Sequence, residues 1–333
     1  MPGSKDLIII NNLKKYFTLD SGFLSSKKEI IKAVDGVSFT IKEKETIGLV
    51  GESGCGKTTT GKLLIRLIEP TTGHINYEGE DIFTLTKNRV RELRKKMQFI
   101  FQDPYSSLNP RMNVGSIVGE GLKVHKILTT RARRKRVEEL LMLVGLRPQD
   151  IQRYPHEFSG GQRQRIGIAR AISLNPSFLI ADEPISALDV SIQAQILNLL
   201  LDLKRKLGLT LLFISHDLHA VKFISDRIIV MYKGKIVEIA DCEEIFKNPS
   251  HPYTRFLLSA VLQIDPGKRK KREIFYEPEK EVFNKGCSFL NYCKEKKDRC
   301  YVKHPDLTEK AEGHFVACHC HCPNLTVRAQ GLD

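Results

Sequence analysis

The segment at residues 51–58 constrains the fold of this chain more than any other. It reads GESGCGKT and fits the pattern G-x-x-x-x-G-K-[ST] in full. A short apolar run at 46–50 precedes it, and residues 58–68 behind it have helical spacing. A strand, a glycine-rich loop and a helix in that order are what a parallel nucleotide-binding sheet requires. The sequence therefore predicts an α/β fold built around a phosphate-binding loop (P-loop).

The residue types of this loop indicate what it binds. Glycines let backbone N–H groups close around phosphates, and the following helix adds the positive end of its dipole. We expect Lys57 to reach the β- and γ-phosphates of ATP and Thr58 to hold Mg²⁺. Cys55 stands at a variable position of the pattern and receives no role. The predicted ATP-binding residues of the loop are Gly51, Ser53, Gly54, Gly56, Lys57, Thr58 and Thr59.

A pair of acidic residues ends a second apolar run. Residues 178–183 read FLIADE, with Pro184 next. Isolated carboxylates are usually solvated surface groups, but two in succession at the end of a buried strand are not typical of surface groups. Asp182 is predicted to bind Mg²⁺, directly or through water, and Glu183 to polarise the attacking water as general base.

The stretch FSGGQRQR at 158–165, about a hundred residues after the P-loop, indicates which class of P-loop protein this is. With the motifs above it resembles only the ATP-binding cassette (ABC) ATPases, and residues 7–262 resemble the nucleotide-binding domain of an ABC transporter. The resemblance implies a P-loop NTPase core with an antiparallel β subdomain and an α-helical subdomain. It also implies a signature that caps the γ-phosphate of ATP bound to the opposite subunit. That signature consists of Ser159, Gly160, Gly161 and Gln162.

The same resemblance implies roles for four further residues. Gln102 would be the Q-loop residue that senses Mg²⁺ and touches the coupling helix of the permease. Asp189 matches the D-loop, and His216 matches the switch histidine that contacts the γ-phosphate. Tyr16 is the candidate to stack on adenine, although a core tyrosine would look the same in the sequence.

Longer motifs resemble the dipeptide/oligopeptide permease branch and, within it, the F-type (DppF/OppF-like) ATP-binding subunits. They are FQDPYSSLNPRM at 101–112, AVDGVSF at 33–39, HPYT at 251–254, KTTTGK at 57–62 and EPTTG at 69–73. The resemblance implies an ATPase that powers import of di- or oligopeptides at the cytoplasmic face of the cell membrane. Its partners would be a second ABC ATPase subunit (D-type or a second copy), two transmembrane permease subunits and, through them, an extracytoplasmic peptide-binding protein. A nickel or glutathione importer, or less readily a soluble ABC ATPase acting on nucleic acid, is the alternative.

Length and composition fit this interpretation. The 333 residues suffice for one sizeable α/β domain and a smaller appendage. We place the nucleotide-binding domain at 1–262, with its helical subdomain at about 104–174, and the C-terminal extension at 263–333. The net charge of +14 suits solubility or an anionic membrane surface, and no nucleic-acid-binding module accompanies it. The apolar runs are shorter than the roughly 20 residues of a membrane span, and residues 7–10 are predicted to begin a first strand.

Cysteines are concentrated in the extension. Six of the eight follow residue 286, namely Cys287, Cys293, Cys300, Cys318, Cys320 and Cys322. Without a secretion signal, metal binding is favoured over disulfides. Cys287, Cys293, Cys300 and Cys318 lack the C-x₂₋₄-C pair usual for zinc, and the family resemblance implies that they hold a [4Fe-4S] cluster, with Zn²⁺ as the alternative. The run CHCHC at 318–322 departs from that pattern.

Overall fold

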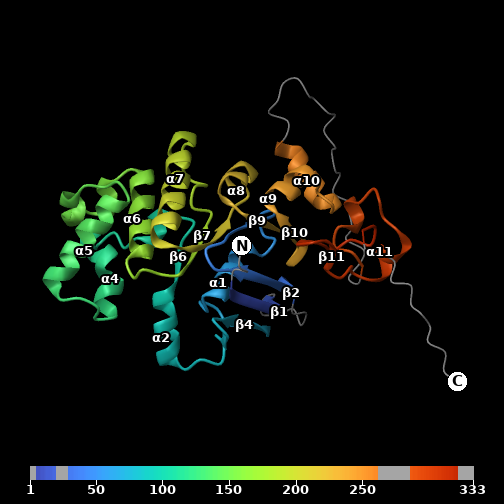
Figure 1. Ribbon diagram of the computed structural model, residues 1–333, viewed down its shortest axis with the longest axis horizontal. Coiled ribbons are helices and arrows are strands. Elements are labelled where there is room, and N and C mark those ends of the chain that lie inside the picture. The colour runs from blue at the N-terminus through green and yellow to red at the C-terminus, as the bar shows by residue number, and fades with distance from the viewer. Residues whose placement is uncertain (1–4, 20–28, 262–285, 322–333) are drawn as a thin grey trace, which may run out of the picture.

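Two β-sheets form the framework of the computed structural model, which describes residues 5–19, 29–261 and 286–321 (Figure 1). The smaller sheet is antiparallel and has the order β2-β1-β4-β5. Its strands are β1 (Asp6–Leu19), β2 (Glu29–Lys42), β4 (Thr72–Tyr77) and β5 (Glu80–Asp81). The predicted antiparallel strands at 7–17 and 30–41 are thus confirmed.

The larger sheet has the order β11-β12-β10-β9-β3-β8-β7-β6. The strands β9, β3, β8, β7 and β6 run parallel, and β10, β12 and β11 continue the sheet in antiparallel fashion. The bounds are β3 (Thr46–Val50), β6 (Met97–Ile100), β7 (Phe178–Asp182), β8 (Thr210–Ile214), β9 (Arg227–Tyr232), β10 (Lys235–Asp241), β11 (Thr308–Ala311) and β12 (His314–Val316).

Helices cover the sheets, and a helical group lies at one end of the molecule, opposite the tail (Figure 1). That group contains α3 (Pro104–Ser107), α4 (Val114–Val124), α5 (Thr130–Leu143) and α6 (Gly160–Ile172), with 3₁₀ turns at Pro148–Gln152 and Pro155–Glu157. The other helices are α1 (Lys57–Leu64), α2 (Lys87–Lys96), α7 (Val190–Leu207), α8 (Leu218–Ile224), α9 (Cys242–Lys247), α10 (Pro252–Val261) and α11 (Asp298–Val302), with a 3₁₀ turn at Leu290–Tyr292.

Helix α1 is shorter than the helical spacing predicts. It ends at Leu64 rather than 68, because the backbone of Arg66 adopts a left-handed conformation with φ of 50°. Its beginning at Lys57 places the P-loop between β3 and α1, as predicted. The helix lies above a sheet whose central strands β3, β7 and β8 are buried at every residue. Buried strands of this kind read as continuous apolar runs because both faces are covered.

The parallel strands fix where the predicted site residues lie. The carboxyl ends of neighbouring parallel strands meet at one edge of a sheet, where ligands bind in open α/β folds. Gly51 directly follows β3 and Glu183 directly follows β7, while Gln102 and His216 stand two residues beyond β6 and β8. Four strands that are neighbours in the sheet therefore deliver these four residues to one edge.

The cysteine-rich tail is attached to the central sheet. Strand β12 pairs with β10, with Val316 opposite Glu238. The predicted domain boundary at 262/263 falls at residues 262–285, which lie outside the described residues, so the division into two domains stays a prediction. Within the ranges described above, no helix combines the length and apolar character needed to span a membrane.

Candidate functional site

The P-loop depends on two glycines that no other residue could replace without strain. A Cβ on Gly51, whose φ is 152°, would lie 2.2 Å from the carbonyl oxygen of Met231. A Cβ on Gly56, whose φ is 106°, would lie 2.1 Å from the carbonyl oxygen of Ala33. The side chain of Lys57 is buried within the loop, where Nζ donates to the carbonyl oxygens of Gly51 and Glu52, each over 2.8 Å. The loop is therefore a close-packed cradle with a cation at its centre.

Asp182 lies beside the P-loop at the end of β7. The hydroxyl of Thr58 donates a hydrogen bond to Asp182 Oδ1 over 3.0 Å. Burial, together with the nearby charge of Glu183, raises the pKa of Asp182 above its ordinary value despite that bond. A buried carboxylate of this kind is stabilised by a cation, and carboxylate and hydroxyl oxygens are ligands that Mg²⁺ accepts.

Glu183 is held by the two residues predicted to act with it. Gln102 Nε2 donates to Glu183 Oε2 over 2.9 Å, and His216 Nδ1 lies 3.2 Å from Glu183 Oε1. The backbone of Glu183 has φ of 44°, a left-handed conformation that is uncommon outside glycine. Strained conformations of this kind cluster at functional sites.

These residues surround one cavity of about 500 Å³. The predicted residues that line it are Ser53, Gly54, Gly56, Lys57, Thr58, Thr59, Gln102, Glu183 and His216. Lys32 and Lys233 line it as well, so that with Lys57 the lining has three lysines against the single acid Glu183. The excess of cations favours an anionic ligand such as a polyphosphate.

Sequence reasoning missed the part of the cavity wall that packs against the P-loop. Ile31, Lys32 and Ala33 of β2 and Lys233 and Gly234 of the β9–β10 turn also line the cavity. The turn is fixed to the P-loop because Gly234 N donates to the carbonyl oxygen of Cys55 over 2.9 Å. The dipeptide Lys233-Gly234 indicates a turn, but nothing local in these segments indicates that they face a ligand.

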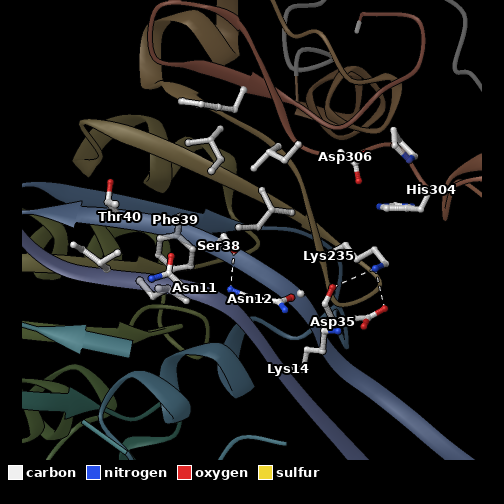
Figure 2. Close-up of a pocket in the computed structure, with 18 of the residues that line it drawn as sticks. Asn11, Asn12, Lys14, Asp35, Ser38, Phe39, Thr40, Lys235, His304 and Asp306 are labelled. Atoms are coloured by element: carbon white, nitrogen blue, oxygen red, sulfur yellow. Dashed lines mark hydrogen bonds and ion pairs between the residues drawn. The ribbon is translucent and has the colours of Figure 1, made fainter. Parts of the chain in front are cut away.

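Tyr16 is not among the residues that line the cavity. Its hydroxyl donates to Asp35 Oδ1 over 2.5 Å. Asp35 in turn pairs with Lys235 over 2.8 Å in a different hollow of about 650 Å³, between strands β1 and β2, strands β9 and β10, and the tail at His304 and Asp306 (Figure 2). Tyr16 nevertheless pairs with Lys32 of β2, and Lys32 Nζ, 5.7 Å from the centroid of the Tyr16 ring, belongs to a residue that lines the P-loop cavity. Stacking of Tyr16 on adenine therefore stays a prediction.

The signature residues lie apart from the P-loop cavity and are largely exposed. Ser159 is the N-cap of α6, where its backbone N–H donates to Gln162 Oε1 over 3.0 Å and its hydroxyl accepts from Gln162 N. The described lining of the cavity includes none of residues 159–162. An exposed N-terminus of a 13-residue helix presents unpaired N–H groups to whatever docks there. Asp189, the N-cap of α7, is exposed too.

The tail cysteines lie near one another without forming a ready metal site. Burial, with the neighbouring cysteines, raises the pKa of Cys287 to about 11 and that of Cys318 to about 12. Across the described part of the chain, however, no three His, Cys, Asp or Glu side chains are grouped so that they could hold a metal ion. The predicted [4Fe-4S] cluster on Cys287, Cys293, Cys300 and Cys318 is therefore not supported by the structure, and neither is Zn²⁺. Cys322 lies outside the described residues.

Parallel strands that bring a P-loop, an acid pair and a histidine to one edge of a sheet define a P-loop nucleotide-binding protein. Comparison with known families supports a finer assignment. The family "ABC transporter" matches residues 34–186, and the family "Oligopeptide/dipeptide transporter, C-terminal region" matches residues 237–300.

Known proteins support the same family assignment. The oligopeptide transport ATP-binding protein AppF of Bacillus subtilis is 50% identical, with 94% of this chain and 97% of that protein covered. OppF of the same organism is 49% identical over 95% and 97%. A solved dimer of the ATP-binding cassette MJ0796 bound to ADP and Pi has a TM-score of 0.63 at 30% identity, covering 71% of this chain and 98% of that one. The chain belongs to the ABC transporter family, in the branch of oligopeptide and dipeptide transport ATP-binding proteins.

Proposed function

We propose that this chain is the ATP-hydrolysing subunit of an ABC importer of oligopeptides. The observation that carries the proposal is the convergence of Lys57, Thr58 and Glu183 on one cation-rich cavity, with Gln102 and His216 bonded to the same glutamate. The relatives at about 50% identity are named as peptide transport ATP-binding proteins, and their coverage of nearly the whole chain supports the same activity here.

The residues divide the work of hydrolysis. The phosphates of ATP bind the N–H groups of the P-loop and one N–H of Lys57 Nζ, while the carbonyl oxygens of Gly51 and Glu52 accept from the same ammonium group and hold it in position. Glu183 accepts the proton of the attacking water, and His216 holds that carboxylate in place and contacts the γ-phosphate. Positioning and electrostatic stabilisation supply most of the rate, as in other phosphoryl transfers.

Thr58, Asp182 and Gln102 are the proposed residues of the magnesium site. Thr58 and Asp182 already share a hydrogen bond, so their oxygens lie together and would hold the ion, Asp182 directly or through water. Mg²⁺ is commonly bound by one or two protein oxygens with substrate phosphates and water, so this donor set suffices. When bound, the ion neutralises charge between the β- and γ-phosphates.

A complete site requires a second ABC subunit, because residues 159–162 do not reach this chain's own P-loop cavity. We propose that two cassettes close head to tail. Ser159, Gly160, Gly161 and Gln162 then cap an ATP held by the partner, with Asp189 at the same interface. The partner is a D-type subunit or a second copy of this chain.

An apolar hollow beside the Q-loop is the proposed docking place of the permease. It has a volume of about 450 Å³ and lies between α2, β6, α4, α6 and the residues that follow α1. Leu67, Phe101 and Val124 line it with 44%, 38% and 50% of their surface exposed. Because Phe101 directly precedes Gln102, a membrane subunit seated here would be coupled to the catalytic site. The chain would then work at the cytoplasmic face of the membrane.

Transport in membrane vesicles tests the proposal. Vesicles that contain the assembled transporter with its peptide-binding protein should accumulate labelled oligopeptide only when ATP is supplied on the side of this chain. Transporter assembled with Glu183→Gln should accumulate none. Uptake of nickel or glutathione in place of peptide would favour the related importers, and ATPase activity stimulated by DNA or RNA alone would favour a role on nucleic acid.

For the tail, the finer proposal is that Cys287, Cys293, Cys300 and Cys318 hold an iron–sulfur cluster. Their proximity supports it, and the lack of a ready ligand group among the described residues speaks against it. The raised pKa values mean that any metal must displace thiol protons. Chain purified without oxygen should contain iron and absorb broadly in the visible range. A colourless protein that contains zinc or no metal would refute the cluster.

A further inference from the structure

The motif HPYT at 251–254, to which the proposed function gives no role, lies against the P-loop. Tyr253 is fully buried in α10, and its hydroxyl oxygen accepts a hydrogen bond from the backbone N–H of Glu52 over 2.9 Å. Burial raises the pKa of Tyr253 well above its ordinary value, so the phenol remains neutral at physiological pH. A residue far from the P-loop in sequence is thus bonded directly to it.

The peptide unit between Gly51 and Glu52 is consequently held at both ends. Its carbonyl oxygen accepts from Lys57 Nζ over 2.8 Å, and its N–H donates to Tyr253. Because a peptide unit is planar, fixing the direction of the N–H also fixes the direction of the carbonyl. Tyr253 therefore determines the orientation of one of the two carbonyl groups that hold the lysine of the phosphate site.

The cysteine-rich tail packs against Tyr253. The ring of Phe289, only 3% exposed, lies 5.6 Å from the ring of Tyr253 and 5.4 Å from that of Tyr232. The Tyr232 and Tyr253 rings are themselves 4.5 Å apart. Aromatic contacts of this kind fix ring orientation as well as burying area. Phe289 stands two residues after Cys287, in the tail that lies beside α10 and β10 (Figure 1).

A second tail residue is linked by hydrogen bonds to the segment that carries Tyr253. Tyr253 N donates to His251 Nδ1 over 3.0 Å, and His251 N donates to Glu238 Oε2 over 2.9 Å. The other oxygen of Glu238 bonds His314 Nε2 of β12 over 2.8 Å. Burial lowers the pKa of His251 to about 3, which keeps Nδ1 available as an acceptor. Two tail residues, Phe289 and His314, therefore support the beginning of α10, where Tyr253 lies.

We propose that Tyr253 is a positioning residue for the P-loop and that Phe289 of the tail holds Tyr253 in place, so that the tail contributes to the affinity of the site for ATP. The inference rests on the proposed function, in which the P-loop binds ATP. Without the phenol oxygen, the N–H of Glu52 loses its acceptor and the peptide unit is free to turn. The loss of one such hydrogen bond corresponds to roughly a three- to tenfold change in affinity.

The experiment measures binding of a fluorescent ATP analogue with Mg²⁺, and steady-state ATPase kinetics, on the full-length chain. Tyr253→Phe keeps the buried ring and should weaken nucleotide binding about fivefold and raise KM equally, with kcat within twofold of the wild type. Phe289→Leu should shift Kd and KM in the same direction. In the double variant the second change should add nothing, because both act through one contact.

Tyr77→Phe is the matched control. Tyr77, in β4 of the antiparallel sheet, is also buried, and its hydroxyl hydrogen-bonds Ser177 over 2.6 Å. The Tyr77→Phe change should lower the unfolding temperature as much as Tyr253→Phe while leaving nucleotide affinity unchanged. If Tyr253→Phe binds ATP as the wild type does, or Tyr77→Phe weakens binding equally, the role of Tyr253 is refuted; unchanged binding in Phe289→Leu refutes the role of the tail. Wild-type binding that survives Lys57→Ala would instead refute the proposed function itself.

Discussion

The hydroxyl of Thr58 donates a hydrogen bond to Asp182 Oδ1 over 3.0 Å, although the two residues are 124 positions apart in the chain. The bond joins the first turn of α1 to the end of β7. It holds together the two oxygens that we propose for the magnesium site. The arrangement leaves the carboxylate of Asp182 buried beside Glu183, which costs stability as long as no cation is bound.

Asp182→Asn should stabilise the nucleotide-free chain while abolishing its ATPase activity. The pKa of Asp182 is raised in the folded state, so the stabilisation due to this group is complete below the unfolded pKa of about 3.9 and is lost as the pH rises through the folded pKa. At pH 7 the variant should unfold about 2–4 °C higher, as expected for a gain near 1 kcal/mol. Thermal unfolding in chelator measures the shift, which should vanish near pH 4. The exposed Asp202→Asn is the control, and a lower unfolding temperature at pH 7 would contradict the assignment.

Glu183→Gln should bind ATP and fail to hydrolyse it. The amide cannot accept a proton from water, and loss of a general base lowers turnover about 10²- to 10⁴-fold. Phosphate release gives the turnover, and retention of labelled ATP by the assembled dimer gives the binding. The exposed Glu312→Gln in the tail should behave as the wild type. Undiminished turnover in Glu183→Gln would show that another group is the base.

Ser159→Arg should leave ATP binding by the single chain intact and block ATP-dependent dimer formation. Ser159 is exposed at the N-cap of α6 and lies outside the P-loop cavity, so a large cation there obstructs only a docking partner. Nucleotide binding and light scattering with and without ATP separate the two effects. Ser116→Arg adds the same charge at another exposed position of the helical group. Loss of ATP binding in the Ser159 variant would contradict a site shared between subunits.

His314→Ala should loosen the tail from the central sheet. The change leaves the fully buried carboxylate of Glu238 with only the N–H groups of Ser250 and His251 as donors. Removing one hydrogen-bond donor from a buried carboxylate should lower the free energy that holds the tail on the sheet by about 2 kcal/mol. Amide hydrogen exchange in β12 should accelerate about 30-fold, the equivalent of that free energy. The exposed His156→Ala should change nothing, and unchanged exchange in β12 would mean that the pair does not hold the tail.

Much of the catalytic machinery could be predicted from the sequence because its conformations are local. The positive φ angles of Gly51 and Gly56 belong to the loop itself, although the atoms that exclude a Cβ there come from Met231 and Ala33, and the capping of α6 by Ser159 and Gln162 depends on residues three apart. The acid pair at 182–183 is recognisable because a buried parallel strand reads as a continuous apolar run. Family resemblance then supplied roles for Gln102 and His216, whose contacts with Glu183 agree with them.

Long-range pairing decided the rest. No local pattern indicates that β12 extends the central sheet, that β2 and the β9–β10 turn form a wall of the ATP cavity, or that Tyr16 bonds Asp35. The predicted iron–sulfur site depends on such contacts too, since spacing in the chain does not determine how thiols are grouped in space, and the described residues show no ready ligand group. By itself the sequence determined the chemistry that each short segment can perform. The tertiary structure alone decided which segments meet, because strand order and side-chain packing depend on what the whole chain can bury together.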